Sequence, residues 1–501
     1  MIAYKKYHEF IDEISPNEIY EGLLAHGLFN EKLPPIFTSK SFYDFCKSNA
    51  PTFSKEATNY VFYENIRNIN IPRPLGIPNP MAYQLLCKNI SEIWVDMQNH
   101  FKVQTEHQAH KISRIHLRKM KDKQCLFEMN YDNWKVDGSP EPDLLIGKKY
   151  LVSADISNCF PSIYTHALSW ALVGKEEAKR EQKDHSKWYN KLDFYTRNIK
   201  NGETHGLLIG PHVSNLLSEI ILVNVDKVLY DKGFKFIRNI DDYTFYAETY
   251  EKCQEFLIQL SSSLRDYDLT LNYKKTKILE LPRATSEQWI RKINAFNTFE
   301  FKPTLNYKDV QTYLDLSLDL MKGNNDNAAI LNYAIKVLSK KTLTANAKQY
   351  FLKTVYHLCI IYPYIIPLLE NNVFIPCGAS KDSVSEISQL IFDTNIKSQN
   401  YEGVSFALYF AIKYEFVLTN LDFNSIKESN NAICLLLSYL YICKNGKRND
   451  KKLYTELAKH LASNEDTFNL FWIFIYECLP KSSLRGQWKY IKNNSISFIF
   501  I

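Results

Sequence analysis

Apolar and polar positions divide the chain into two parts of different character. Before about residue 285, short strand-like segments alternate with longer helical patterns. Leu144 to Ile156 carries apolar residues for both faces of a sheet, which predicts a central strand with Asp155 at its end. Phe234 to Ala247 places aromatic and β-branched residues on both sides of Asp241-Asp242, which predicts two short strands joined at a bend.

Three further segments of the first part have recognisable patterns. Arg67 to Asn79 contains three prolines and cannot be helical, so extended backbone would hold Arg67 and Arg73 on one side, ready for phosphates. Gly206 to Ser214 is a glycine-punctuated loop that leads into a helix with one buried face. Leu269 to Ile278 predicts strand, turn and strand, with lysines near the turn.

The second part, from residue 286 onward, consists of successive amphipathic patterns separated by short polar breaks at 322–326 and 444–449. No fixed repeat period emerges, but paired helices stacked as an irregular α-solenoid would fit. The predicted fold class is therefore α+β for domain 1–285, followed by an all-α domain at 286–501.

Composition narrows the class of protein. A hydrophobic fraction of 45% and a charged fraction of 23% are ordinary for a globular protein, and only 15 glycines argue against an all-β fold. The net charge of +6 permits a nucleic-acid partner without requiring one. Ten cysteines without a C-x-x-C pair argue against a zinc site and favour reduced thiols. With no signal-peptide pattern and no membrane-spanning stretch, we expect a cytoplasmic protein without a membrane partner.

The carboxylates carry the candidate chemistry. Taken singly, Asp155 is typical of a helix N-cap and Asp241-Asp242 of a surface turn. Taken together, three carboxylates suit the clamping of two divalent cations, which joins a hydroxyl to a nucleotide α-phosphate. The spacing alone does not establish that the two strands are neighbours.

The ordered set of segments resembles the palm motifs of reverse transcriptases. Asp155 to Ile163 is similar to motif A, Gly206 to Ser214 to motif B, Ile240-Asp241-Asp242 to motif C and Leu271 to Ile278 to motif D. The run from Arg73 to Pro78 matches the fingers of bacterial reverse transcriptases. The resemblance covers roughly residues 60 to 285 and implies a palm-and-fingers fold.

The resemblance implies a catalytic set and its metals. Asp155, Asp241 and Asp242 would be the catalytic carboxylates. Asp155 and Asp241 would bind both of two Mg²⁺ ions, for which Mn²⁺ is an alternative, and the Ile156 carbonyl would bind one of them.

The resemblance also implies how the nucleotide is held. Phe160 occupies the place of the aromatic that excludes a ribose 2′-hydroxyl, so the substrates would be dNTPs. Arg73 would face the triphosphate, and Gly210 would let backbone approach the nucleotide. Lys275 occupies the place of the motif D lysine, a proton donor to the pyrophosphate.

Some positions depart from the reverse-transcriptase pattern. Asn239 replaces the usual aromatic before the aspartate pair, and Ile209 replaces the usual glutamine of motif B. No recognisable thumb follows motif D. These departures leave the metal chemistry intact and argue against templated copying.

The run Gly210 to Leu217, the run Arg238 to Asp242 and the helical second half are similar to abortive-infection polymerases of bacterial phage defence, of a prophage-encoded type. That resemblance implies untemplated DNA synthesis primed by a protein hydroxyl, a single-stranded DNA product attached covalently, and a homo-oligomer, either trimer or hexamer. The sequence does not select the primer among Tyr4, Tyr7, Tyr43 and the other tyrosines. Two alternatives stay open: a conventional RNA-directed DNA polymerase of the retron or intron type, and a catalytically silent scaffold that acts through its helical domain.

Overall fold

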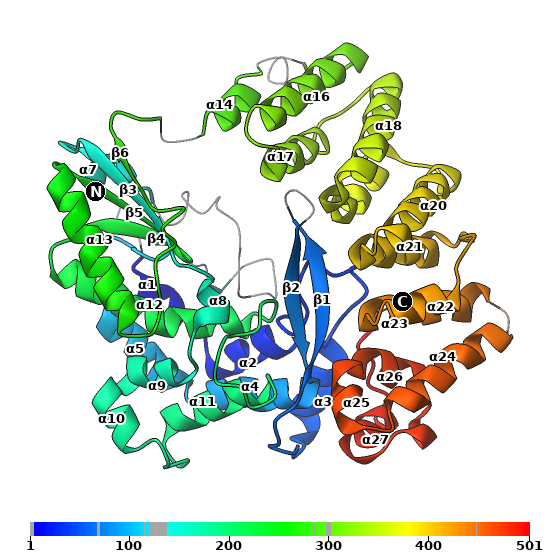
Figure 1. Cartoon of the computed structure of the whole chain (residues 1–501), viewed down its shortest axis with the longest axis horizontal. Helices are drawn as coiled ribbons and strands as arrows, with labels where there is room; N and C mark the ends of the chain where they lie inside the picture. The colour runs from blue at the N-terminus through cyan, green and yellow to red at the C-terminus, as the bar shows by residue number, and fades with distance from the viewer. Residues whose placement is uncertain are drawn as a thin grey trace.

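The computed structural model describes residues 5–67, 71–114, 117–119, 126, 138–284, 287–296, 302–446 and 448–500. A mixed α/β half is followed by a helical half, and Figure 1 shows the helical half curving in an arc from α14 to α27. The predicted α+β fold with a helical C-terminal region is confirmed. The domain boundary predicted at residue 285 lies outside the described residues.

The sheet of the first half has four antiparallel strands in the order β4-β5-β3-β6. Their bounds are Tyr150–Asp155 for β3, Phe236–Asn239 for β4, Asp242–Ala247 for β5 and Lys277–Glu280 for β6. Helices α12 (Val213–Asp231) and α13 (Tyr250–Arg265) pack together, and α13 contacts β3 and β5. The first strand predicted within 269–278 is only an isolated bridge between Ile156 and Leu271, because the chain turns immediately afterwards.

A second, two-stranded sheet is formed by β1 (Tyr60–Ile66) and β2 (Pro72–Pro78). We call it the fingers hairpin. Every second residue of β2 is a proline, except that Gly76 stands between Pro74 and Pro78. The Gly76 N–H points away from β1 and donates to the Ile209 carbonyl at 2.8 Å. The prolines are therefore tolerated because the N–H groups on that side of β2 do not pair with β1.

Short helices surround the hairpin and the sheet, with α1 packed on α5, α2 on α4, and α11 on α4 and α9. Their bounds are α1 Tyr7–Asp12, α2 Pro16–Leu24, α3 Lys40–Asn49, α4 Pro80–Glu92, α5 Trp94–Thr105, α7 Glu141–Leu145, α8 Cys159–Ser162, α9 His166–Val173, α10 Lys175–Arg180 and α11 Trp188–Asn198.

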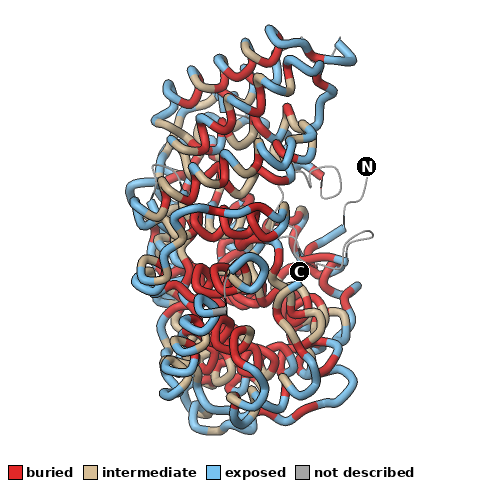
Figure 2. Tube along the Cα trace, turned by 90° about the vertical axis from the view of Figure 1, so that its right-hand side faces the viewer, coloured by how far each residue is buried: buried red, intermediate tan, exposed pale blue. Residues whose placement is uncertain are grey.

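The helical half stacks its helices in series, with α16 on α17 and α18, α18 on α20, α20 on α21, α21 on α23, and α23 on α26. Figure 2 shows buried turns on the inner sides of these helices and exposed turns outside. No helix in the described part of the chain is long and apolar enough to cross a membrane. The bounds are α14 Gln288–Asn294, α16 Tyr307–Lys322, α17 Ala328–Leu338, α18 Ala345–Ile361, η3 Pro363–Leu368, η4 Glu370–Phe374, α19 Ile375–Cys377, α20 Lys381–Lys397, α21 Tyr401–Tyr414, α22 Phe423–Glu428, α23 Ala432–Asn445, α24 Arg448–Leu461, α25 Glu465–Leu470, α26 Trp472–Cys478, η5 Lys481–Ser483 and α27 Gly486–Asn493.

The end of the chain returns to its beginning. Phe37 and Ile499 form an antiparallel bridge, and the Phe500 N–H donates to the Ile36 carbonyl at 2.7 Å. The Trp472 and Phe498 rings meet edge to face, with centroids 5.0 Å apart. The last helices are therefore packed against the first half and do not form a separate domain.

Candidate active site

The three predicted carboxylates come together at one edge of the sheet. Asp155 at the end of β3 and Asp242 at the start of β5 are direct cross-strand partners, and Asp241 lies in the turn before β5. Each carboxylate offers an oxygen that lies within 4.8 Å of the others. The strand pairing, which the sequence left open, thus creates a cluster of oxygen donors with the composition that a divalent cation prefers.

The turn that carries Asp241 is held in an unusual conformation. Ile240 has φ +58°, a left-handed value that is costly for a β-branched residue. Two hydrogen bonds hold it: the Arg238 Nη1 donates to the Ile240 carbonyl at 2.7 Å, and the Ile156 N–H donates to the Asp241 carbonyl at 3.1 Å. The backbone of Ile156, predicted to offer a carbonyl to a metal, thus lies directly beside the cluster.

Arg238 is the centre of a buried ion cluster. Its side chain is 0% exposed and contacts two carboxylates of α12, with Nη1 to the Glu219 Oε1 at 2.6 Å and Nη2 to the Asp226 Oδ2 at 2.6 Å. Burial disfavours the charged guanidinium, but Asp226 and Glu219 outweigh it and raise the pKa of Arg238. Burial also raises the pKa of Asp226 to about 6, against the opposing charge of Arg238.

Sequence reasoning missed this cluster. A signal was present, because Glu219 and Asp226 are two acidic residues two helical turns apart on a segment that is otherwise largely apolar. Acidic residues on a buried helix face require a cation, and Arg238 stands close to the aspartate pair in the sequence.

Mutual repulsion is visible at the carboxylates. Burial raises the pKa of Asp242 to about 7, and the hydrogen bond with Asp155 and the charge of Asp241 act in the same direction. Burial is also the main cause that raises the pKa of Asp241, to which the charge of Asp155 adds. The charge of Lys275 opposes both shifts. A cation bound here would relieve this repulsion, so the donor set fits divalent metal ions.

Two residues of the motif D segment contact Asp155 from the side. The Lys275 Nζ lies 3.1 Å from Oδ1, in an ion pair whose lysine side chain is 66% exposed. The Asn272 Nδ2 donates to Oδ2 at 3.0 Å. Lys275 therefore lies at the carboxylate cluster, and its role as a proton donor stays a prediction. Asn272 is a further contact that sequence reasoning did not single out.

The two arginines of the fingers hairpin differ in their placement. Burial lowers the pKa of Arg67, whereas the negative charge of Asp241 raises it, so this guanidinium lies within electrostatic reach of the carboxylates. Arg73, on β2, is half-buried and pairs in register with Asn65. Among the described residues, neither arginine has a carboxylate within ion-pair distance, so no ion pair there competes with an anionic substrate.

Phe160 and the motif B loop are joined by backbone contacts. The Leu207 N–H donates to the Phe160 carbonyl at 2.8 Å, and the Phe160 side chain on α8 is half-buried. At Gly206 (φ +84°), a Cβ would come within 2.8 Å of the Pro161 carbonyl oxygen. At Gly210 (φ +131°), a Cβ would lie 3.1 Å from the Gly76 carbonyl oxygen. The bare Cα of Gly210 is thus required by the fingers hairpin, in addition to the predicted approach of a nucleotide.

These features define a polymerase-type palm, with carboxylates from two neighbouring strands facing a hairpin that carries arginines. Residues 74–327, more than half of the 501-residue chain, match the family described as "Reverse transcriptase (RNA-dependent DNA polymerase)". The chain belongs to this family. It is thus a nucleotidyltransferase of the reverse-transcriptase type, a class that generally uses divalent metals.

Two further comparisons were made, with curated proteins and with solved structures. No curated protein matches the sequence. Among solved structures, telomerase from Candida tropicalis in complex with a TWJ fragment of telomeric RNA has 13% identity, with 74% of this chain and 68% of that chain covered and a TM-score of 0.29. Apo telomerase from Candida tropicalis has 12% identity, with 74% of this chain and 72% of that chain covered and a TM-score of 0.30. Candida albicans telomerase in complex with a TWJ fragment of telomeric RNA has 13% identity, with 73% of this chain and 67% of that chain covered and a TM-score of 0.27.

Proposed function

We propose that the protein polymerises dNTPs with two divalent metal ions, without copying a template and from a protein hydroxyl as primer, in abortive-infection defence against phage. The observation that carries the proposal is the cluster of Asp155, Asp241 and Asp242, with oxygens within 4.8 Å of one another. The phage role, a covalently attached single-stranded DNA product, a homo-oligomer (trimer or hexamer) and a cytoplasmic location rest on the resemblance to abortive-infection polymerases.

In the proposed reaction, a hydroxyl gives its proton to solvent and its oxygen attacks the α-phosphorus of a dNTP. The bond to the β-phosphate oxygen breaks, and pyrophosphate leaves. Asp155, Asp241 and the Ile156 carbonyl would hold two Mg²⁺ ions. When bound, these ions stabilise the attacking and leaving oxygens.

The chain's own side chains would complete the site. Arg67 and Arg73 would bind the triphosphate by charge-assisted hydrogen bonds. Lys275, released from Asp155 when the metals bind, would give a proton to the departing pyrophosphate. Phe160 would pack against the sugar and exclude a 2′-hydroxyl.

The absence of a template is supported by two side chains. Ile209 and Asn239 stand where templated enzymes carry a glutamine and an aromatic. Ile209 is a half-buried apolar residue whose carbonyl accepts from Gly76, so its side chain offers a template base no amide group.

The second candidate function is an RNA-directed DNA polymerase of the retron or intron type. It is favoured by the family description, which names RNA-dependent DNA polymerases.

The primer tyrosine stays open. Tyr7 and Tyr43 are 4% and 2% exposed, and the Tyr43 hydroxyl donates to Glu21. Tyr4 lies outside the described residues. Priming by Tyr7 or Tyr43 would require its side chain to leave the core.

The first test is incorporation of labelled dNTPs by purified protein with Mg²⁺ and no added nucleic acid. We expect polymer to form, and mass analysis of the protein as purified to show attached DNA. If polymer forms only when an RNA template and a primer are supplied and copied, the conventional polymerase replaces the untemplated one.

The second test is Asp241→Asn. Loss of a metal ligand removes several kcal/mol of transition-state stabilisation, so incorporation should fall on the order of 10³-fold. Asp268→Asn is the matched control, because Asp268 is exposed and its φ of +61° suits asparagine. Near-wild-type incorporation by Asp241→Asn would contradict the metal site, and phage resistance that survives this change would favour a silent scaffold.

A further inference from the structure

The fingers hairpin, which carries Arg67 and Arg73, is held by the helical half as well as by its own half. Strand β1 contacts α21, α23, α25, α26 and η3, all of them helices that follow residue 362. On the opposite side, Gly76 of β2 bonds to Ile209 of the motif B loop. The hairpin therefore lies between the palm and the helical half, and no third strand pairs with it in the part of the chain that the structure describes.

One contact reaches the tip of the hairpin, where the arginines lie. Glu402 on α21 is 2% exposed, and its two carboxylate oxygens accept from the Asn65 Nδ2 at 2.6 Å and from the Ile66 N–H at 2.7 Å. Ile66 pairs with Pro72, so its N–H points away from β2 and would be unsatisfied without Glu402. The carboxylate thus bonds both the side chain and the edge of β1 just before Arg67.

The position of Glu402 is itself fixed. It lies in the first turn of α21, where the helix dipole favours a negative charge. A Cβ at the next residue, Gly403, would lie 2.5 Å from Asn395 of α20, so glycine allows α20 and α21 to approach closely there. Burial raises the pKa of Glu402 to about 7, and the bonds from Ile66 and Asn65 and the charge of Lys32 oppose that rise. The group is therefore a rigid acceptor whose ionised form depends on the hairpin.

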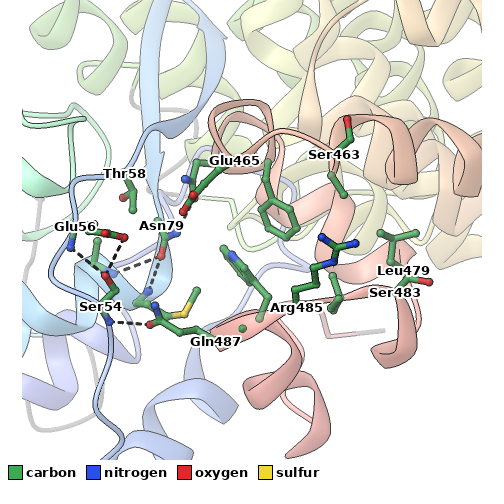
Figure 3. Close-up of a pocket in the computed structure, with 18 of the residues that line it drawn as sticks. Ser54, Glu56, Thr58, Asn79, Ser463, Glu465, Leu479, Ser483, Arg485 and Gln487 are labelled. Atoms are coloured by element: carbon green, nitrogen blue, oxygen red, sulfur yellow. Dashed lines mark hydrogen bonds between the residues drawn. The ribbon is translucent and has the colours of Figure 1, made fainter.

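Contacts at the base of the hairpin are less close. A cavity of about 620 Å³ lies between the loop before β1 and the last helices. The Ser54 N–H donates to the Gln487 Oε1 across it at 3.0 Å, a bond that is drawn in Figure 3. Near the same cavity the Asn79 Nδ2 donates to the Asn469 Oδ1 at 2.8 Å. The base thus borders a cavity, whereas the tip is held by two hydrogen bonds to a single buried carboxylate.

We infer that Glu402 is a positioning residue through which the helical half sets the place of Arg67 and Arg73 at the nucleotide site. The link is short. Asn65 is the cross-strand partner of Arg73, so their side chains share one face of the hairpin, and Ile66 is bonded directly to Arg67. The helical half, which stands where a thumb would follow the palm, thereby controls nucleotide binding by the fingers. This inference rests on the proposed function, because it assigns the two arginines to a dNTP.

The test replaces the acceptor and then restores it. Glu402→Gln removes the negative charge and leaves one acceptor oxygen for the two donors, the Asn65 Nδ2 and the Ile66 N–H, so the tip should loosen. We expect the KM for dNTP to rise about tenfold, as for the loss of a charge-assisted hydrogen bond, with a smaller change in kcat. The double variant Asn65→Asp with Glu402→Gln exchanges carboxylate and amide across the same pair, and it should return the KM to near the wild-type value.

Glu370→Gln is the control for general damage to the helical half. Glu370 is also buried there, but its carboxylate accepts from Tyr409 and pairs with Lys413. The Glu370→Gln variant should leave the KM for dNTP unchanged, even if its melting temperature is lower than that of the wild type.

Hydrogen exchange of residues 60–78 gives a readout that does not depend on activity. Exchange should be faster in Glu402→Gln, unchanged in Glu370→Gln and restored in the double variant. Unchanged exchange in Glu402→Gln, equal effects of both single variants, or failure of the double variant to restore protection would overturn the inference. If wild type polymerises nothing under any condition, the proposed function fails, while hydrogen exchange still decides whether Glu402 holds the hairpin.

Discussion

Most α-helices of the helical half begin at residues whose side chains cap them, whereas most helices around the palm do not. Side-chain oxygens accept from the first-turn N–H groups at Asn306, Asn327, Thr344, Ser380, Asn400, Asp422, Asn431 and Asn464. No such side-chain bond is made at the starts of α8, α9, α11 and α12. Local contacts thus set the helix starts of the helical half more often than those around the palm.

The two halves also differ in what they bury around their central features. The palm places Arg238 with two carboxylates at 0–1% exposure, next to three further carboxylates at the sheet edge. The helical half is dominated by apolar helix packing, with isolated carboxylates such as Glu370 and Glu402. A buried charge lowers the stability of a protein unless its partners are present. The first half, which contains the palm, therefore depends on long-range contacts to remain folded.

The largest expected effect that separates the halves is at Arg238. Arg238→Met removes the only cation seen to bond Glu219 and Asp226 in the described structure and leaves two buried carboxylates uncompensated. We expect a loss of about 3–5 kcal/mol in the free energy of unfolding, measured by urea denaturation. Arg265→Met, on the exposed last turn of α13, is the control. A loss below about 1 kcal/mol would show that the cluster is not essential to the palm.

A smaller effect is expected in the dependence of metal binding on pH. Asp242 lies beside the proposed ligands Asp155 and Asp241, and its pKa of about 7 means that the metal-free group takes up a proton as the pH falls through 7. Protonation removes negative charge that would attract a metal ion to the cluster. Apparent Mg²⁺ affinity should therefore be constant well above pH 7 and fall by up to about tenfold per pH unit below it. Mg²⁺ titrations followed by thermal shift at pH 6 and pH 8 would measure this. Equal affinities at the two pH values would contradict the raised pKa.

The smallest effect is expected at a cap of the helical half. The Asn431 Oδ1 accepts from two N–H groups of α23, those of Ile433 and Cys434. Asn431→Ala should cost about 1 kcal/mol in thermal or urea unfolding, with polymerase activity per folded molecule unchanged. Asn445→Ala, at the exposed other end of α23, is the control. If polymerase activity per folded molecule falls together with stability, a helix cap in the helical half also affects the palm, and the contrast between the two halves is contradicted.

Several features of the fold and site could be predicted from the sequence because they are encoded by neighbouring residues. The strand that ends at Asp155, the bend at Asp241-Asp242 and the extended segment around Arg73 all follow from side-chain alternation and proline placement. The change to a helical second half follows from amphipathic periods with polar breaks. The motif order then indicated which carboxylates to expect at one site.

Tertiary structure alone decided which of these residues meet. Asp155 lies opposite Asp242 because β3 and β5 pair in that register, and a shift of one residue would have turned one side chain to the other face. Arg238 finds its partners on α12, and Glu402 bonds to Asn65, 337 positions away. A local sequence pattern indicates whether a segment forms a helix, a strand or a turn, because neighbouring residues determine that choice. Pairs that are distant in the sequence depend on how whole helices and strands pack, and no single stretch of sequence contains that information.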